Sequence, residues 1–233
     1  MLPLVIIPTY NERENLIPLI DAVQSNLPSG HALIVDDNSP DGTGKLAAKR
    51  AREDPLVHVM HRQTKEGRGP GLISPVLAGL WPANTATFLR WTPISATTRR
   101  TCRGCWRPPE TPISHLAAVG CRAAPCRGGS FRRLMLSRLG NLYARIVLSV
   151  PYRDLTGGFK CFRRHALQRI DLETIVAVGY GFQIETTWRA LQTGLSVSEV
   201  PIVFTDRVRG DSKMSLSTFN EALGLVWRLR MGG

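Results

Sequence analysis

Short apolar runs alternate with amphipathic segments over the first 62 residues, and this alternation restricts the possible folds more than any other feature. Residues 4–10, 32–37 and 56–62 are apolar and rich in β-branched side chains, as expected for strands buried on both faces. Residues 11–27 and 43–54 carry apolar side chains at helical spacing, and we expect Asn11 to cap the first helix. This order with short connections predicts a parallel, doubly wound α/β sheet.

The last hundred residues also predict regular structure. Residues 132–150 have the pattern of a basic amphipathic helix, and residues 154–167 indicate a glycine-rich loop or short strand that leads into a helix. Residues 179–194 and 217–230 have helical spacing, and residues 195–207 have the character of a strand. Because the chain has no internal repeat and no low-complexity linker, we expect a single domain over residues 1–233.

Residues 71–127 differ from the rest of the chain in charge and in cysteine content. They contain seven arginines, no lysine and one acid, and so supply half of the formal net charge of +12. Such a charge suggests nucleic acid, a phosphorylated substrate or an anionic membrane as partner. Four of the five cysteines also lie here: Cys102, Cys105, Cys121 and Cys126.

No apolar run approaches the roughly 20 residues that a membrane-spanning helix needs. Residues 1–8 are too few for a signal peptide, and no basic segment precedes them. The sequence therefore predicts a cytoplasmic protein with reduced thiols.

Polar side chains follow the first two predicted strands, at the edge where parallel sheets bind their ligands. Tyr10 and Glu12 follow the first strand, and Asp36 and Asp37 end the second. Paired carboxylates at a strand end bind ribose hydroxyls or a metal, or they only cap a loop. The residues alone leave both interpretations open.

A second polar group lies near the C-terminus. Residues 207–213, RVRGDSK, place Arg207, Arg209 and Lys213 around a glycine turn. This arrangement suits the grip on a diphosphate, and a solvated basic loop is the alternative.

Together these segments resemble the polyprenol-phosphate (dolichol-phosphate) mannose synthases, which are inverting family-two glycosyltransferases of the GT-A fold. The resemblance covers about residues 1–70 and 131–226, and it rests on VIIPTYNERENL, IVDDNSPDGTG, RLGNLYARIVL, DLTGGFKCFRR, GYGFQIE and VPIVFTDRVRGDSKMS. It implies a Rossmann-like, mostly parallel sheet flanked by helices. It also implies transfer of mannose from GDP-mannose to a polyisoprenyl phosphate, with Mg²⁺ or Mn²⁺ as cofactor.

The resemblance assigns roles to individual residues. Those expected to bind the nucleotide sugar are Pro8, Tyr10, Glu12, Val35, Asp36, Asp37, Arg207 and Lys213, of which the last two would hold the diphosphate. Those expected on the sugar and acceptor side are Asp154, Thr156, Gly157, Gln183 and Glu185. The implied partners are GDP-mannose, a polyprenyl phosphate lipid and the cytoplasmic surface of a membrane, and a membrane-anchoring protein stays open.

The chain departs from the family at one place. The family carries an Asp-Ala-Asp motif after its fourth strand, followed by a Gly-Ser-Arg segment. The donor's diphosphate needs such a metal site, or equivalent positive charge, in order to leave. Here no aspartate occurs between Asp54 and Asp154. The motif therefore assigns no catalytic residue and no metal ligand in this chain.

Residues 71–131 have the properties of an out-of-frame translation. Trp91 is encoded by TGG and the codons of Thr92 begin with AC, so the shifted codon at this junction is GAC, which encodes aspartate. With permitted synonymous codons, residues 90–98 yield Met-Asp-Ala-Asp-Leu-Ser-His-Asp, and residues 110–119 yield Asp-Ala-Asp-Leu-Ala-Leu-Gly-Ser-Arg. A pair of frameshifts or a sequencing error, near Gly71 and Arg132, would explain both segments.

This interpretation weakens two alternatives. The four clustered cysteines have nearly the spacing of a zinc ribbon, but the second pair is too wide for Cys-x-x-Cys. Nucleic-acid binding loses half of the charge that suggested it, and we expect no nucleic-acid partner.

The same interpretation predicts weak packing and little activity. We expect poorly ordered or misfolded structure over residues 71–131, with inconsistent burial of Trp91, Ile94, Cys105 and Trp106. Without the acids, the chain should be inactive or nearly so. A catalytically inactive nucleotide-binding or scaffold protein of the same fold is therefore the alternative function.

Two basic amphipathic segments remain, residues 132–145 and 223–230. They are candidates for lying on anionic lipid, with Trp227 and Leu229 in the interface and the arginines outward. Packing of these helices against the core is the alternative.

Overall fold

The computed structural model describes residues 3–63, 86–89, 116–123, 131–158, 160–175, 177, 179–202 and 216–232. Its elements are β1 (Pro3–Thr9), α1 (Arg13–Asn26), β2 (His31–Asp36), α2 (Thr43–Glu53), β3 (Val57–His61), β4 (Ala86–Leu89), β5 (Leu116–Ala123), α5 (Phe131–Leu148), β6 (Lys160–Arg163), α6 (Arg164–Ile170), the 3-10 helix η2 (Leu172–Thr174), α7 (Gly179–Gln192), β7 (Ser196–Ile202) and α8 (Leu216–Arg230).

The described strands form one seven-stranded sheet in the order β3-β2-β1-β4-β6-β5-β7. The pairs β1–β2, β2–β3, β1–β4 and β5–β7 are parallel, whereas β6 runs antiparallel to both β4 and β5. The predicted α/β class with a mostly parallel sheet is therefore confirmed. The single antiparallel strand, β6, brings its first residue to the carboxyl end of β4.

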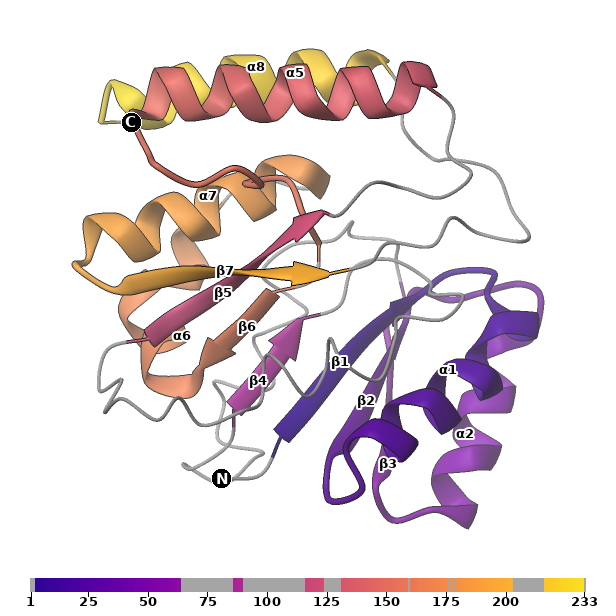
Figure 1. Cartoon of the computed structure of the whole chain (residues 1–233). Coiled ribbons are helices and arrows are strands. Elements are labelled where there is room, and N and C mark those ends of the chain that lie inside the picture. Colours follow the sequence, from indigo (N-terminus) through magenta and orange to yellow (C-terminus); the bar gives the residue numbers. More distant parts are fainter. Residues whose placement is uncertain are drawn as a thin grey trace.

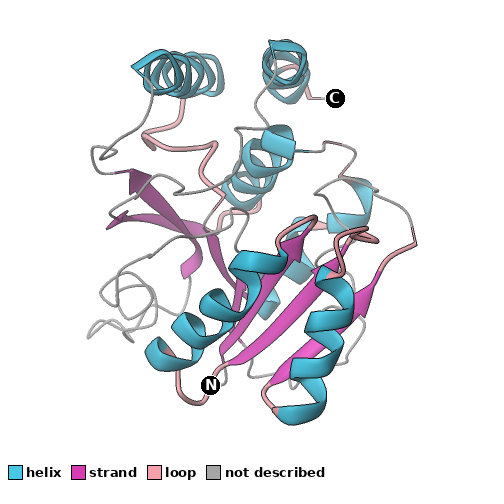
Figure 2. Cartoon of the chain, turned by 90° about the vertical axis from the view of Figure 1, so that its right-hand side faces the viewer, coloured by secondary structure: helices cyan, strands magenta, loops and turns pink. Residues whose placement is uncertain are grey.

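Helices cover both faces of the sheet (Figures 1 and 2). Alternate residues of β1 point to opposite faces: Val5 and Ile7 pack with α1 and α2, whereas Leu4 and Ile6 pack with α6 and α7. This two-sided burial explains the unbroken apolar runs in the sequence. On the side of α6 and α7, α5 and α8 lie next to each other as an outer layer, packed on α7.

The start of α1 differs from the expectation. Asn11 is not the N-cap: its φ is 56°, which is the left-handed region that asparagine tolerates, and Glu12 precedes the first helical residue. The backbone N–H of Asn11 donates to Ser39 Oγ at 3.1 Å. Asn11 therefore turns the chain toward the loop after β2 instead of capping the helix.

Besides Phe131, which begins α5, two pieces of the window 71–131 belong to the described residues, and both are strands: β4 pairs with β1 and β6, and β5 pairs with β6 and β7. Trp91, Ile94, Cys105 and Trp106 lie outside the described residues, so weak packing of the window stays a prediction. Within the described part of the chain, no helix has the length and hydropathy required to span a bilayer.

Candidate functional site

The ends of β1 and β2 bring the expected nucleotide residues together. Pro8 pairs with Val35, and Thr9 pairs with Asp36. The N–H of Asp37 donates to Thr9 O at 3.1 Å, so Tyr10 and Asp37 follow neighbouring strand ends. The predicted clustering of these residues at the carboxyl edge of the sheet is confirmed.

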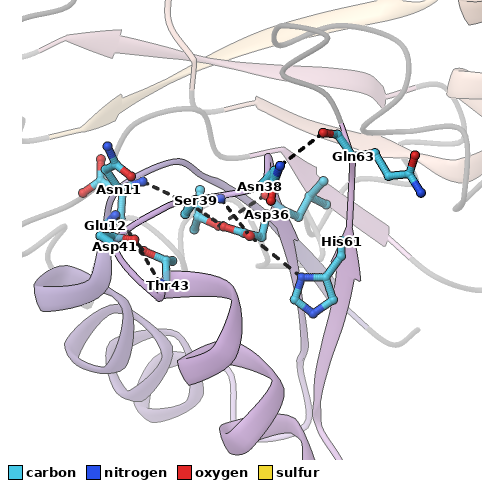
Figure 3. A network of polar contacts seen from close by, with 11 residues as sticks. Asn11, Glu12, Asp36, Asn38, Ser39, Asp41, Thr43, His61 and Gln63 are labelled. Atoms are coloured by element: carbon cyan, nitrogen blue, oxygen red, sulfur yellow. Dashed lines mark hydrogen bonds and ion pairs between the residues drawn. The ribbon is translucent and has the colours of Figure 1, made fainter.

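Asp36 anchors the loop after β2 (Figure 3). Its buried carboxylate accepts hydrogen bonds from Ser39 N at 3.2 Å, from Ser39 Oγ, and from Thr9 Oγ1 at 3.4 Å. A Cβ atom at Gly44 would lie 2.5 Å from Asp36 Oδ2, so only glycine fits there without displacing the carboxylate. Of the two aspartates, Asp36 is thus the one that holds the loop.

Asp37 has a different partner. Its carboxylate lies 3.4 Å from the guanidinium of Arg62, and the side chains of Arg62 and Asp37 are only 9% and 7% exposed. The N–H of Arg62 also donates to Asp36 O at 2.9 Å, which fixes Arg62 beside the end of β2. Arg62 was not predicted from the sequence. A signal was available, because Arg62 ends the third apolar run and this run is expected to lie beside the second run, which ends in Asp37.

The loops after β1 and β2 are joined by side-chain hydrogen bonds. Thr43 Oγ1 accepts from Glu12 N at 3.0 Å, and Asp41 Oδ2 accepts from Arg13 N at 3.2 Å. Burial raises the pKa of Asp41, but hydrogen bonds from the side chain and backbone of Thr43 and from the backbone of Arg13 outweigh it, and the net pKa is lowered. Asp41 is therefore an ionised acceptor that fastens the two loops together.

Strand register places a second group at the same edge. Ile6 of β1 pairs with Leu89 at the end of β4, and Leu89 pairs with Lys160 at the start of β6. The segment before Lys160 therefore reaches the sheet beside the carboxyl ends of β1 and β4. Because the family resemblance predicts Asp154, Thr156 and Gly157 on the acceptor side, we call residues 153–157 of this segment the acceptor loop.

The acceptor loop is folded around Asp154. The carboxylate of Asp154 accepts from Gly157 N at 2.8 Å and from Thr156 Oγ1 at 3.2 Å. Glu199 of β7 accepts from the N–H groups of Arg153 and Asp154 at 2.6 and 2.8 Å. Burial raises the pKa of Asp154, and the charge of Glu199 adds to this, against the opposing effects of Lys160 and the two hydrogen bonds.

Lys160 is a buried cation between this loop and α7. Its Nζ donates to Leu155 O at 3.2 Å, to Gln183 O and to Thr187 Oγ1. Gln183 is 1% exposed, and among the described residues neither its amide nitrogen nor its amide oxygen has a hydrogen-bond partner. A buried amide without a partner costs free energy, so its retention needs an explanation.

Glu185 does not join the acceptor loop. Its carboxylate accepts from Arg189 Nη2 at 2.7 Å and from Nε at 2.9 Å. Arg189 also donates to Thr174 O at 3.1 Å and to Asp171 O at 3.2 Å. Arg189, held by Glu185, thus fastens α7 to η2, and the role of Glu185 on the sugar and acceptor side stays a prediction.

Other expected site residues fall outside the described residues, namely Arg207 and Lys213, as do three of the four clustered cysteines. Cys121 lies in β5. Among the described residues, no group of three or more histidine, cysteine, aspartate or glutamate side chains could hold a metal ion. The residues that follow Leu89 of β4 in the sequence are Arg90 and Trp91, so the chain does not supply the expected acids after this strand.

The α5–α8 layer exposes several large apolar side chains. We call the α5 surface that carries Met135, Leu139, Leu142 and Ile146 the outer face; the neighbouring helix α8 exposes Trp227 and Met231. The α5 members recur at spacings of 4, 3 and 4 residues, which is one helical stripe. Trp227 is 55% exposed, as expected for an interfacial residue, but Leu229 is only 8% exposed and packs in the core, so its placement in the interface was wrong.

Comparison with known sequences identifies relatives over nearly the whole chain. The family Glycosyl transferase family 2 matches residues 4–73. The polyprenol monophosphomannose synthase of Mycolicibacterium smegmatis is 43% identical over 243 aligned positions, which cover 97% of this chain and 87% of that protein. The undecaprenyl-phosphate mannosyltransferase of Micrococcus luteus is 38% identical and covers 97% of this chain and 92% of that protein.

Solved structures share the fold. A mannosyltransferase of Pyrobaculum calidifontis in complex with GDP-Man and Mn²⁺ superposes with a TM-score of 0.59 at 17% identity, covering 97% of this chain and 69% of that one. Glucosyl-3-phosphoglycerate synthase of Mycobacterium tuberculosis with Mn²⁺ and UDP-glucose gives 0.69 at 16% identity, covering 99% and 79%. By its fold and its close relatives, this chain belongs to the polyprenol-phosphate mannose synthases of glycosyltransferase family 2.

Proposed function

We propose that this chain has the fold of an enzyme that transfers mannose from GDP-mannose to a polyprenyl phosphate with inversion at the anomeric carbon. The observation that carries the proposal is the register Ile6–Leu89–Lys160, which brings the strand ends at Asp37 and the acceptor loop to one edge of the sheet. A donor and an acceptor bound there would meet beside β4. The relatives with 38–43% identity are named for polyprenol and undecaprenyl-phosphate mannosyl transfer.

The reaction depends on positioning of the two substrates more than on acid–base chemistry. An oxygen of the lipid phosphate attacks the anomeric carbon of mannose, the bond from that carbon to the diphosphate oxygen breaks, and GDP leaves with the electron pair. The phosphate is already an anion near neutral pH, so no strong general base is needed. What the protein must supply is alignment of the two substrates and stabilisation of charge on the leaving diphosphate.

The proposed roles follow the placement of the residues. Asp37, held by Arg62, would accept from the nucleotide, with Pro8, Tyr10 and Val35 around it. Arg207 and Lys213 would neutralise the diphosphate, as the family resemblance implies. The acceptor loop, with Thr156 and Gly157, would meet the acceptor phosphate. Gln183, whose buried amide lacks a partner, would contact the sugar or acceptor after a small rearrangement.

In the part of the chain that the structure describes, no cluster of side chains fits a divalent metal. Solved structures of the fold contain Mn²⁺ with their nucleotide sugars, but the acids expected after β4 are missing from the sequence. We therefore propose that the printed chain is impaired in transfer and retains nucleotide binding. The family match that ends at residue 73, close to Gly71, supports a change of frame at this point.

Nucleotide binding is tested on the chain as printed by calorimetric titration with GDP, GDP-mannose and UDP-glucose. Asp37→Asn should weaken binding of the guanine nucleotides by about tenfold or more, because the variant loses one charge-assisted hydrogen bond to the nucleotide. Asp21→Asn is the matched control, because Asp21 pairs with Arg50 on the surface of α1 and α2, away from the strand ends. Equal affinities in both variants would refute the assignment of Asp37.

Transfer is tested by comparing the printed chain with a chain encoded in the restored frame over codons 71–131. We expect transfer of labelled mannose to undecaprenyl phosphate only by the restored chain, and only with Mg²⁺ or Mn²⁺. A restored chain that folds but neither transfers mannose nor responds to metal would refute the enzyme assignment. If such a chain still binds GDP-mannose, the inactive nucleotide-binding or scaffold protein is the correct function.

We also propose that the outer face attaches the protein to an anionic membrane. Arg138, Arg145, Arg228 and Arg230 are exposed on α5 and α8, and α5 contains no acid. An apolar stripe flanked by cations fits a lipid surface with anionic head groups. Flotation with vesicles that contain phosphatidylglycerol should capture the protein.

A double variant sharpens the flotation test. Leu142→Gln with Ile146→Gln should lower capture by about tenfold, because both side chains are at least half exposed on the outer face. Lys49→Gln is the control, because it removes a cation from α2, which lies far from α5 (Figure 1). It should leave capture unchanged. No capture of the native chain by any vesicle would contradict direct attachment and favour a membrane-anchoring partner.

A further inference from the structure

Asn141 lies in the middle of α5 and is buried, although its neighbours Leu139 and Leu142 belong to the exposed outer face. Its side-chain amide makes four hydrogen bonds. Oδ1 accepts from Leu155 N at 2.8 Å and from Thr156 N at 3.2 Å. Nδ2 donates to Thr156 Oγ1 at 2.9 Å and to Ser137 O at 3.0 Å. The amide therefore uses its full capacity of two donors and two acceptors.

Three of these four hydrogen bonds go to the acceptor loop. Asn141, which makes them, lies in a different layer of the fold from the other residues that hold the loop. Glu199 belongs to β7 and Lys160 to β6, so both hold the loop to the sheet. Asn141 belongs to α5, which lies in the outer layer. Leu155 of the loop packs beside Ala144 and Leu148 of α5. In the part of the chain that the structure describes, Asn141 is the α5 side chain that adds directional hydrogen bonds to this contact.

We propose that Asn141 is a positioning residue that fixes the acceptor loop at a set depth relative to the membrane surface. The inference rests on the proposed function, because it assumes that the outer face lies on lipid and that the loop meets the acceptor. A lipid-linked acceptor carries its phosphate at the level of the head groups, so the depth of the loop decides whether the phosphate reaches the donor. Displacements near 1 Å at such a site cost about 100-fold in rate.

The geometry suits this task. The outer-face side chains and Asn141 project from opposite sides of one α-helix, whose diameter with side chains is about 10 Å. A helix that settles on lipid therefore carries the loop with it as a nearly rigid body. The loop cannot shift along α5 without breaking the hydrogen bonds that Leu155 N and Thr156 N donate to Asn141. Breaking these bonds would leave buried polar groups without a partner, which costs free energy.

Hydrogen–deuterium exchange of the acceptor-loop amides tests the proposal, with and without vesicles that contain phosphatidylglycerol. In the native chain, vesicles should slow exchange at Leu155 and Thr156 by threefold or more. In Asn141→Ala this lipid-dependent slowing should vanish while flotation stays equal to the native chain. Ser137→Ala is the matched control: the hydroxyl is exposed on the same helix and only the carbonyl of Ser137 bonds Asn141, so it should behave as native.

Each outcome decides between the proposals. A variant Asn141→Ala that keeps the slowing would show a purely structural role and overturn the inference. Flotation of the native chain without any slowing would overturn the inference alone, whereas no flotation would overturn it together with membrane attachment. If Asn141→Ala fails to fold, Thr156→Val removes one of the same bonds at nearly constant volume, and unchanged slowing in that variant would likewise refute the coupling.

Discussion

Replacement of Gln183 by methionine tests whether its buried amide is kept for a ligand. Both polar atoms of the amide are buried without a partner, and a buried unsatisfied polar group costs about 1–3 kcal/mol. Methionine has nearly the same length and volume and no group that needs a hydrogen bond. Gln183→Met should therefore stabilise the fold by about 1–3 kcal/mol, which raises Tm by roughly 2–4 °C per kcal/mol in a chain of this size. Chemical and thermal unfolding measure the change.

Thr187→Val is the matched control, one helical turn further along α7 and equally buried. Thr187 Oγ1 accepts from the buried Lys160 ammonium, and a hydrogen bond to a charged group contributes about 1.5–3 kcal/mol. The control should therefore lower stability by that amount at constant volume. If Gln183→Met also lowers stability, the amide is satisfied by ordered water, and the argument for a ligand contact fails. If it stabilises and leaves sugar-nucleotide and acceptor binding unchanged, the amide has no substrate role.

Three further predictions follow from close contacts and titrating groups. In urea unfolding, Gly44→Ala should destabilise the fold by about 1–3 kcal/mol, because its Cβ would lie 2.5 Å from a buried carboxylate oxygen. Gly224→Ala, with open space around it in α8, should instead stabilise the fold by up to about 1 kcal/mol. Burial and the charge of His31 lower the pKa of His58, so the native state binds fewer protons than the unfolded state. Stability should therefore fall as the pH drops below about 6.5, and His58→Gln should flatten this fall between pH 7.5 and 5. The raised pKa of Asp154 has the opposite sign: stability should fall as the pH rises from about 4, and Asp154→Asn should abolish that fall in urea unfolding measured upward from pH 4.

The first half of the fold was predictable because its signals are local and agree with one another. Runs such as residues 4–10 are apolar without interruption only where both faces of a strand are covered, and β1 is covered on both. The antiparallel direction of β6 was not predictable, because residues 160–163 carry no signal of direction. The error at Asn11 has a similar cause: asparagine favours both the N-cap and the left-handed conformation, and the contact with Ser39 decides between them.

The candidate site was predictable only where it lies at strand ends. Parallel neighbours place Asp37 beside Tyr10 without further information. The supports of the acceptor loop come from residues far apart in the chain: Asn141, Lys160 and Glu199 lie on three different elements. A lone asparagine in a helix or a glutamate in a strand gives no sign of a backbone partner elsewhere. Such contacts depend on tertiary packing, which no local pattern encodes.

The register of β4 bears on the interpretation of residues 71–131 independently of any codon. β4 lies between β1 and β6, and its last residue, Leu89, pairs with Ile6 on one side and Lys160 on the other. The carboxyl end of β4 therefore lies between the nucleotide edge and the acceptor loop, where the reaction we propose needs charge. The shifted frame places its first aspartate at the junction of Trp91 and Thr92, two residues after the strand ends. The genetic code fixes that codon independently of where the strand ends. Resequencing of the DNA across codons 65–135 should accordingly show one inserted or deleted base near Gly71 and a compensating one near Arg132. An unbroken frame that encodes the printed residues would refute the frameshift and make the cysteine- and arginine-rich window a true part of this protein.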